Sequence, residues 1–281
     1  MSPIELFSPA HRPPQEIGFP AVCCAFRAGR LLVQRAGAAP QLPRLHPGQL
    51  GVDLGESHYL GTLDGQHCFA FMLTEEQPLP EHGELMGMRD FILGADDISA
   101  AVAGLGLQIV EWSRTHRYCG SCGRPTVAHA ADRARECPDC RQVYYPRISP
   151  VVMALVTRDR QLLLTRKPGY MAGRYTVVAG FVEPGETLEQ ALIREVREET
   201  GVGAAKPLYF GSQPWPFPNS LVMAFALEHA GGEARADGVE LEDARWFDID
   251  ALPELPEPVH ISRQLIDATI ARLAGRTPGG A

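Results

Sequence analysis

Three glutamates in one stretch of the sequence have the spacing of metal ligands. Glu195, Glu198 and Glu199 fall in a segment with helical periodicity that ends at Gly201, a residue type favoured at helix C-termini. Glu195 and Glu199 lie on the apolar stripe of that segment, and Glu198 lies at its edge. Carboxylates on a buried face are costly without a cation. A divalent ion such as Mg²⁺ or Mn²⁺ is therefore one interpretation, and an ordinary acidic helix with solvated glutamates is the other.

Four cysteines form a second group with metal-ligand spacing. They occur as two CxxC pairs with fourteen residues between them: Cys119, Cys122, Cys137 and Cys140. Such knuckles can place four thiolates around a zinc ion, whereas two disulfides or a thioredoxin-like redox pair are the alternatives. Disulfides are disfavoured in a reducing compartment, and a redox CxxC would not occur as a matched pair. We expect a structural zinc ion, because a site closed by four cysteines has no open position for water.

The glutamates need strands and a loop to position them. A strand-to-helix loop, Gly180–Gly185, follows an apolar run and a basic loop at residues 166–174, and loops of this kind present backbone N–H groups to phosphates. Apolar patterns predict strands at 151–156, 162–165, 175–183, 207–213, 221–228 and 245–249, and a packing helix at 260–273.

Residues 1–95 predict a β-rich domain in which we find no catalytic constellation. Strand-like runs occur at 21–26, 30–35, 58–63 and 67–73, and Asp64-Gly65 is a hairpin signal between the last two. Cys23, Cys24 and Cys68 lie in these runs, so we expect them to fill the core.

A helix is predicted to connect this domain to the cysteine knuckles. Apolar residues recur at helical spacing from Ile98 to Trp112, and Asp96 or Asp97 can cap the helix. Gly104 and Gly106 weaken it and would permit close packing.

Two aromatic segments could recognise a flat ligand. Tyr144-Tyr145 follows the second knuckle and could either pack against it or stack on a base. Gln213–Pro218 alternates prolines with Trp215 and Phe217, a rigid arrangement that cannot join a central strand and suits recognition of a flat ligand. A proline-rich turn held by a buried Trp215 is the alternative.

Three further carboxylates precede the strand predicted at 245–249. Glu240, Glu242 and Asp243 are equally plausible as an additional metal ligand or as the group that positions an attacking water. Each could instead be a solvated loop charge.

Composition limits the classes of function. With 281 residues, 45% hydrophobic and 21% charged, the chain is typical of a globular protein. A formal net charge of −8 argues against general binding to nucleic-acid backbones. The N-terminus lacks the pattern of a signal peptide, and no run is long enough to span a membrane. We therefore expect a cytoplasmic protein.

The stretch from Gly180 to Val202 matches the Nudix box at every defined position. The box is a glycine, five residues, a glutamate, seven residues, Arg-Glu, an apolar residue, any residue, Glu-Glu, any residue, a glycine and an apolar residue. Here its defined positions are Gly180, Glu186, Arg194, Glu195, Val196, Glu198, Glu199, Gly201 and Val202. The chain thus resembles the Nudix hydrolases, which cleave nucleoside diphosphates linked to another moiety.

Further motifs resemble the NADH pyrophosphatase branch of that family. SQPWPFPNS at Ser212–Ser220 looks like the branch signature SQPWPFPxS, and the WxRxHRxCGxCG run at Trp112–Gly123 and the YYPR linker at Tyr144–Arg147 are also similar. The likeness covers about residues 96–275 well. Val222 stands where methionine is expected, which puts one pocket contact in doubt.

The resemblance implies a role for individual residues. Glu195, Glu198 and Glu199 would bind catalytic Mg²⁺ or Mn²⁺, and Glu240 aligns best with the additional metal ligand. Glu186 and Arg194 would form an ion pair that braces the box. Phe181 would stack on the substrate, and Tyr145 from the partner subunit would close the pocket of a homodimer. The remaining predicted substrate contacts are Gln213, Trp215, Phe217 and Ser220.

The implied reaction is metal-dependent hydrolysis of NAD(H) to AMP and nicotinamide mononucleotide, with NAD-capped RNA as a further substrate. The implied fold is α+β, with a β-rich domain at 1–95, a connecting helix and zinc ribbon at 96–148, and a Nudix α/β/α sandwich with a mixed sheet at 149–281. A Nudix hydrolase of ADP-ribose or a diadenosine polyphosphate is one alternative. A non-catalytic zinc-ribbon nucleotide or RNA sensor is the other.

Overall fold

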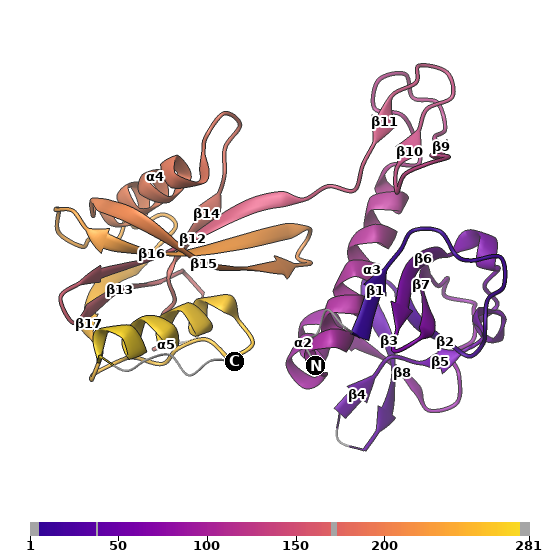
Figure 1. The fold of residues 1–281 in the computed structure, drawn as a ribbon, viewed down its shortest axis with the longest axis horizontal. Helices are drawn as coiled ribbons and strands as arrows, with labels where there is room; N and C mark the ends of the chain where they lie inside the picture. Colours follow the sequence, from indigo (N-terminus) through magenta and orange to yellow (C-terminus); the bar gives the residue numbers. More distant parts are fainter. Residues whose placement is uncertain (1–5, 38, 170–172, 276–281) are drawn as a thin grey trace. The chain divides into compact units, whose positions relative to one another are not determined.

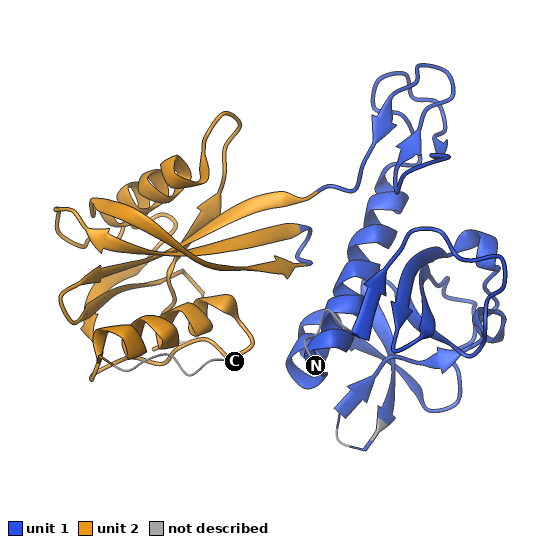
Figure 2. Ribbon diagram, viewed as in Figure 1, with its two compact units in different colours: residues 1–147, 216–219 blue, residues 148–215, 220–281 orange. Residues whose placement is uncertain are grey.

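The computed structural model describes residues 6–37, 39–169 and 173–275. Two compact units are distinguished in Figure 2: residues 1–147 with 216–219, and residues 148–215 with 220–281. Residues 170–172 of the predicted basic loop lie outside the described part of the chain. No helix among the described residues is long and apolar enough to cross a membrane.

The first unit is built on an eight-stranded mixed sheet (Figure 1). The four predicted strands are present as β2 (Ala21–Arg27), β3 (Arg30–Ala36), β6 (His58–Leu63) and β7 (Gln66–Met72). The remaining elements of this domain are β1 (Phe7–Pro9), β4 (Ala39–Gln41), β5 (Arg44–Leu45), β8 (Gly83–Gly87) and the 3₁₀ turns η1 (Pro47–Leu50) and η2 (Leu54–Glu56). Asp64 and Gly65 both have positive φ, as the predicted hairpin turn requires.

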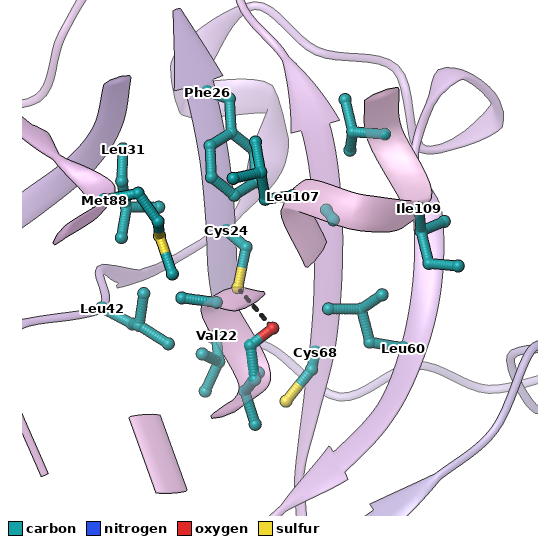
Figure 3. Close-up of a cluster of buried hydrophobic side chains, with 14 of the residues drawn as sticks. Val22, Cys24, Phe26, Leu31, Leu42, Leu60, Cys68, Met88, Leu107 and Ile109 are labelled. Carbon is teal, nitrogen blue, oxygen red and sulfur yellow. Dashed lines mark hydrogen bonds between the residues drawn. The ribbon is translucent and has the colours of Figure 1, made fainter. Parts of the chain in front are cut away.

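A helix covers one face of this sheet. It is α3 (Asp97–Thr115), preceded by α2 (Met88–Gly94), and Asp96 caps it by accepting the backbone N–H groups of Ile98 and Ser99. Val102, Leu107 and Ile109 pack with strand residues such as Cys24 in the core drawn in Figure 3. A Cβ on Gly106 would lie 2.9 Å from Cys24 Cβ, so glycine allows this close approach. The boundary predicted at residue 95 thus falls between a sheet and the helix that covers it.

The three cysteines of this domain are free and buried, as predicted. Cys24 Sγ donates a weak hydrogen bond to the carbonyl of Val102, shown dashed in Figure 3. Burial raises the pKa of Cys23 and of Cys68 to about 12. These thiols therefore act as small core residues.

The cysteine knuckles lie on a small three-stranded sheet within the first unit. Its strands are β9 (Val127–Ala128), β10 (Arg135–Glu136) and β11 (Val143–Tyr144). Arg133 fastens this ribbon to the larger sheet, because its two terminal nitrogens donate to the carbonyls of Tyr59 and Ala10 at 3.2 and 2.7 Å.

The second unit is the predicted α/β/α sandwich with a mixed sheet. Its strands are β12 (Ser149–Arg158), β13 (Gln161–Arg166), β14 (Val178–Phe181), β15 (Ala204–Trp215), β16 (Ser220–His229) and β17 (Asp243–Asp248). Helix α4 (Leu188–Thr200) packs on one face through Ala191, Leu192 and Val196. Helix α5 (Ile261–Leu273) packs on the other through Ile261, Leu265 and Ile266. Strand β15 is an edge strand that extends through Pro214 to Trp215, beyond the predicted end.

The two units repeat one strand topology. In the first, the order β6-β7-β2-β3 has β7 parallel to β2, and β8 and β5 pair with β3 and β2. In the second, the order β15-β16-β12-β13 has β16 parallel to β12, and β17 and β14 pair with β13 and β12. The second unit continues from β14 into α4, whereas the first continues from β5 into the short turns η1 and η2. The first unit is therefore a copy of the second without the glutamate-bearing helix.

Candidate functional site

The loop between β14 and α4 sets the position of the glutamates. Thr187 caps α4 and forms a capping box with Gln190, and Gly201 ends the helix in the left-handed conformation with φ 72°, which confirms the predicted end. Gly180 lies directly against the Glu195 carboxyl group, and a Cβ at this position would overlap it. The glycine is therefore required by the close approach of a carboxylate to the strand.

Arg194 organises the exposed side of the cluster. Its Nε and Nη2 donate to the two oxygens of Glu186 at 2.6 and 2.8 Å, and its Nη1 contacts Glu195 at 2.7 Å and Glu198 at 3.1 Å. Hydrogen bonds from Arg194 and from the Glu183 backbone N–H lower the pKa of Glu186 to about 2. This bidentate pair holds the loop against the helix.

Glu199 is a buried carboxylate whose environment suits a bound cation. Its side chain is 3% exposed, and within the described part of the chain neither carboxylate oxygen has a hydrogen-bond partner. Lys167 Nζ lies 3.9 Å away. Burial raises its pKa to about 7; Lys167 opposes this rise, and the charges of Glu195, Glu240 and Asp237 add to it. A buried carboxylate without partners is costly, and its oxygens suit a hard divalent ion.

The three glutamates of the box differ in exposure. Glu199 and Glu195 are buried or nearly so, whereas the Glu198 side chain is 62% exposed. Glu198 starts from the edge of the apolar stripe, and the guanidinium of Arg194 holds it there together with Glu195. The Glu198 carboxylate therefore lies at the edge of the apolar stripe, as its position in the sequence indicated.

The structure distinguishes the three carboxylates that precede β17. Glu242 pairs with Arg166 at 2.6 Å, and Asp243 accepts the Tyr175 hydroxyl and pairs with Arg245. Glu240 is exposed and contributes to the electrostatic environment of Glu199. Of the three, Glu240 is the one whose charge helps to raise the pKa of Glu199.

Two charged residues near Glu199 escaped the sequence reasoning. Lys167 is in the basic loop, and its Nζ also donates to the carbonyl of Ala179 at 3.4 Å. Asp237 accepts the backbone N–H groups of Val239, Glu240 and Leu241, so it shapes the turn that carries Glu240. The adjacent Gly238, with positive φ, marks this turn in the sequence.

The four cysteines have the geometry of a zinc site. Their sulfur atoms all lie within 4.8 Å of one another. Cys119 and Cys140 are 3.4 Å apart, and Cys122 and Cys137 are 3.5 Å apart. A disulfide requires about 2.05 Å, whereas a tetrahedral zinc site with Zn–S bonds of about 2.3 Å places sulfurs about 3.8 Å apart. The positions of the four sulfur atoms therefore fit a zinc ion. The sulfur–sulfur distances are too long for the alternative of two disulfides.

The two knuckles fold alike. In the first, Gly123 donates to the carbonyl of Cys119 at 2.9 Å and has φ +74°. In the second, Arg141 donates to the carbonyl of Cys137 at 2.9 Å and has φ +61°. The positive φ favours glycine directly after the second cysteine of a knuckle, where Gly123 stands.

Tyr144 and Tyr145 have different environments. The Tyr144 hydroxyl lies 3.1 Å from Cys119 Sγ and accepts the Gly120 backbone N–H at 2.9 Å, so this ring packs on the first knuckle. Tyr145 is 59% exposed, and its hydroxyl donates to Asp132 at 3.1 Å. Of the two predicted interpretations, packing therefore describes Tyr144, while Tyr145 presents an accessible ring.

Three residues of the SQPWPFPNS segment that are predicted to contact the substrate are hydrogen-bonded, packed or buried within the protein. The Gln213 amide donates to the carbonyl of Val259 at 2.8 Å and accepts the N–H of Ile261 at 3.0 Å, so it caps α5. Trp215 packs edge-on against His260 with ring centroids 5.1 Å apart. Ser220 is buried at the start of β16.

The two phenylalanines among the predicted contacts differ in exposure. Phe217 belongs to the first unit, where it packs against the core and under the guanidinium of Arg89, 4.7 Å from the ring centroid. Phe181 ends β14 beside the box loop and is 54% exposed. Of these two rings, Phe181 is the one available to stack on a ligand.

Three family models together match most of the chain. They are a NADH pyrophosphatase-like rudimentary NUDIX domain at residues 20–112, a NADH pyrophosphatase zinc ribbon domain at 114–145 and a NUDIX domain at 147–268. The sequence reasoning left the role of residues 1–95 open. The first match agrees with the strand topology that the two units share.

Curated relatives cover most of their own length and of this chain. The NAD-capped RNA hydrolase NudC of Stutzerimonas stutzeri (strain A1501) is 46% identical over 217 residues, which are 77% of this chain and 78% of the relative. The protein of the same name from Chromobacterium violaceum is 43% identical over 243 residues, 86% of this chain and 89% of the relative. A solved NUDIX hydrolase from Nitrosomonas europaea has 21% identity and a TM-score of 0.48, and covers 57% of this chain and 94% of its own.

Proposed function

Because the chain belongs to the NADH pyrophosphatase branch of the Nudix hydrolase family, we propose that it hydrolyses the pyrophosphate bond of NAD(H). The products are AMP and nicotinamide mononucleotide. The same cleavage removes NAD caps from RNA 5′ ends, as the names of its relatives state for those proteins. The observation that carries the proposal is the buried, unpartnered Glu199 carboxylate beside Glu195 and Lys167, at the end of an intact box.

Mg²⁺ or Mn²⁺ held by Glu195, Glu198, Glu199 and Glu240 would neutralise the diphosphate and lower the pKa of a bound water. Arg194 currently holds two of these carboxylates, and its bidentate pair with Glu186 keeps the loop in place whether or not they turn to a ligand. One of the three box glutamates would also help to deprotonate the attacking water. Phe181 offers an exposed ring for the base or the nicotinamide.

We further propose a cytoplasmic homodimer in which Tyr145 of a second copy of the chain closes the pocket. The exposed Tyr145 ring supports this assignment. Mixing two variants tests it: Glu199→Gln and Tyr145→Ala are each expected to have low activity. If Tyr145 acts across a dimer, a mixed dimer contains one site with both native residues, so activity is regained. Absence of any regain, with subunit exchange demonstrated, would refute the shared site.

The substrate assignment is tested with a panel of dinucleotides. NADH, NAD⁺, ADP-ribose, diadenosine polyphosphate and NAD-capped RNA are incubated in parallel with Mg²⁺ or Mn²⁺, and the products are identified by mass. We expect nicotinamide mononucleotide from NAD(H) and from capped RNA, and no turnover by Glu199→Gln. Faster turnover of ADP-ribose or a diadenosine polyphosphate would favour the other hydrolase, and no turnover of any compound would favour a sensor.

A further inference from the structure

A cavity of about 330 Å³ lies within the first unit, between strands β6 and β7, helix α3 and the zinc ribbon. Its apolar wall consists of Leu54, Tyr59, Phe69 and Trp112. This volume is at the small end of the range of pockets that bind small organic ligands. The cavity is separate from the acidic cluster, whose residues all belong to the second unit.

The polar lining of this cavity is cationic, although the chain carries a net charge of −8. Its basic residues are His11, Arg12, His58, His129, Arg133 and Arg135, and Asp132 is the only carboxylate among the described lining residues. Asp132 accepts the Tyr145 hydroxyl at 3.1 Å and lies 3.8 Å from His129. The arginines therefore face the cavity without an acidic partner.

Arg133 and Arg135 are partly buried, and their hydrogen bonds go to neutral groups. Arg133 donates to two backbone carbonyls, and Arg135 donates to the carbonyls of His116 and Thr126 and to the Thr126 hydroxyl. Carbonyl oxygens satisfy the N–H groups but do not neutralise the charges. Burial, followed by the charges of Arg133 and Arg135, lowers the pKa of His58 to about 4. The two arginine charges therefore act in the same direction as burial and disfavour the protonated form of His58.

One residue of the cavity wall, Trp112, has a buried hydrogen-bond donor without an acceptor among the described residues. Trp112 is 7% exposed, and its indole Nε1 lacks a hydrogen-bond acceptor within the described part of the chain. Buried indole N–H groups usually find an acceptor. The unpaired donor and the unpaired guanidinium charges call for the same kind of group, an anion with several acceptor oxygens.

Part of the cavity wall lies on a sheet face that differs between the two topological copies. Leu54, Tyr59 and Phe69 belong to the core cluster on the sheet face that carries α4 in the second unit. In the first unit that helix and its glutamates are replaced by η1 and η2, and the ribbon contributes arginines instead. A phosphate could therefore contact cationic side chains directly here, without a bridging metal ion.

A groove of about 700 Å³ adjoins the cavity and shares Ser57, His58 and Arg135 with it. It adds Arg117 and Tyr118, whose side chain is 67% exposed, and it contains Glu56. A basic groove with an exposed aromatic ring is typical of sites that follow a single-stranded nucleic-acid backbone. The phosphate that enters the cavity could thus come from a free mononucleotide or from RNA.

We propose that this cavity, lined by Arg12, Arg133, Arg135 and Trp112, is a second ligand site that binds a phosphate group carried on a nucleotide. It is independent of the proposed hydrolysis, because it shares no residue with the box.

The binding is tested through the tryptophan indole N–H signals of ¹⁵N-labelled full-length protein. The chain has three tryptophans, and a Trp112→Phe spectrum assigns the relevant signal. The probes are inorganic phosphate, 5′-UMP and a short 5′-hydroxyl oligouridylate; AMP is avoided because it is the proposed product. We expect a saturable shift of the Trp112 signal. Stronger binding of 5′-UMP identifies a mononucleotide site, and stronger binding of the oligomer identifies an RNA-backbone site.

Substitution of His58 provides a matched pair. His58→Glu places a carboxylate beside the two arginines and should weaken phosphate binding at least about tenfold, because like charges across an interface are strongly unfavourable. His58→Gln introduces no charge and should retain binding. Zinc content and circular dichroism check folding, and the exposed Arg12→Glu variant should also weaken binding if His58→Glu does not fold. The proposal is overturned if no probe shifts the Trp112 signal saturably, or if both acidic variants bind as tightly as the wild type.

Discussion

Replacing Glu199 with glutamine is expected to stabilise the metal-free protein at neutral pH while it removes turnover. The Glu199 side chain is 3% exposed and has no hydrogen-bond partner among the residues that the structure describes. Its pKa is raised from 4.5 to about 7, chiefly by burial. This change corresponds to about 3 kcal/mol of free energy between the two protonation states. Glutamine resembles the protonated side chain, so it avoids the cost of the buried charge.

The sign of the pH dependence follows from the direction of the shift. Because the folded-state pKa is above the unfolded-state value, the stabilisation from the protonated group is complete below about pH 4.5 and is lost as the pH rises through about 7. Metal-free wild-type protein should therefore lose up to about 3 kcal/mol from this group by about pH 8. Glu199→Gln should lose none of it. Added Mg²⁺ should stabilise the wild type and have a smaller effect on the variant.

Two measurements check this prediction. Carboxyl ¹³C NMR should show one glutamate that titrates near neutrality and is missing from Glu199→Gln. Urea unfolding, followed by the indole signal of Trp246 in the second unit, should show the stability difference between about pH 5 and pH 8. The measurements use buffer without divalent ions and no chelator, because a chelator would also remove the zinc ion from the four-cysteine site.

The exposed Glu198→Gln variant is the matched control: it should lower turnover but keep the loss of stability between about pH 5 and pH 8 that Glu199 causes. The reasoning is refuted if Glu199 titrates near its ordinary value, or if Glu199→Gln retains wild-type turnover. In the full assay we expect kcat to fall at least about a hundredfold, the scale for loss of a group that stabilises developing charge.

Three further substitutions test the support of the site. Gly180→Ala should displace the Glu195 carboxyl group that it abuts, and kcat for NADH should fall while zinc content is unchanged; equal kcat would contradict the steric argument. Arg194→Lys loses the bidentate contact with Glu186 and should lower the melting temperature by a few degrees, as about 1 kcal/mol would, which differential scanning calorimetry can measure. Tyr144→Phe removes the hydroxyl beside the first knuckle and should accelerate zinc release to a colorimetric chelator, whereas an unchanged release rate would show that the hydroxyl does not support the site.

Much of the chemistry was accessible from the sequence, because it depends on local spacing. The CxxC pairs predicted the zinc site, and their sulfur atoms lie within 4.8 Å of one another. The helix that carries Glu195 and Glu199 begins and ends at local signals, a capping box and Gly201. The predicted strands and the helices α4 and α5 are also present in the structure, because their apolar periodicity reflects the faces that they bury.

Side-chain environments could not be obtained in this way, because they depend on contacts between distant parts of the chain. From the sequence alone, Glu240, Glu242 and Asp243 were equally plausible as a further metal ligand. The structure distinguishes them, because Glu242 pairs with Arg166, and Asp243 contacts Tyr175 and Arg245. Gln213 is predicted from the sequence to line the pocket, and only the fold shows that its amide also caps α5. Such assignments need the fold, since a polar group's role depends on which partners reach it.

The sequence by itself therefore determined the box, the zinc ligands and the order of the elements, each encoded within a few residues. Only the tertiary structure showed that the first unit repeats the topology of the second, because strand pairing is non-local and the two sequences share no box. The tertiary structure also places Glu198 at the surface, whereas Glu199 is buried and has no hydrogen-bond partner among the described residues. Adjacent carboxylates on one helix differ in this way because packing against the sheet excludes water from one side of the helix only.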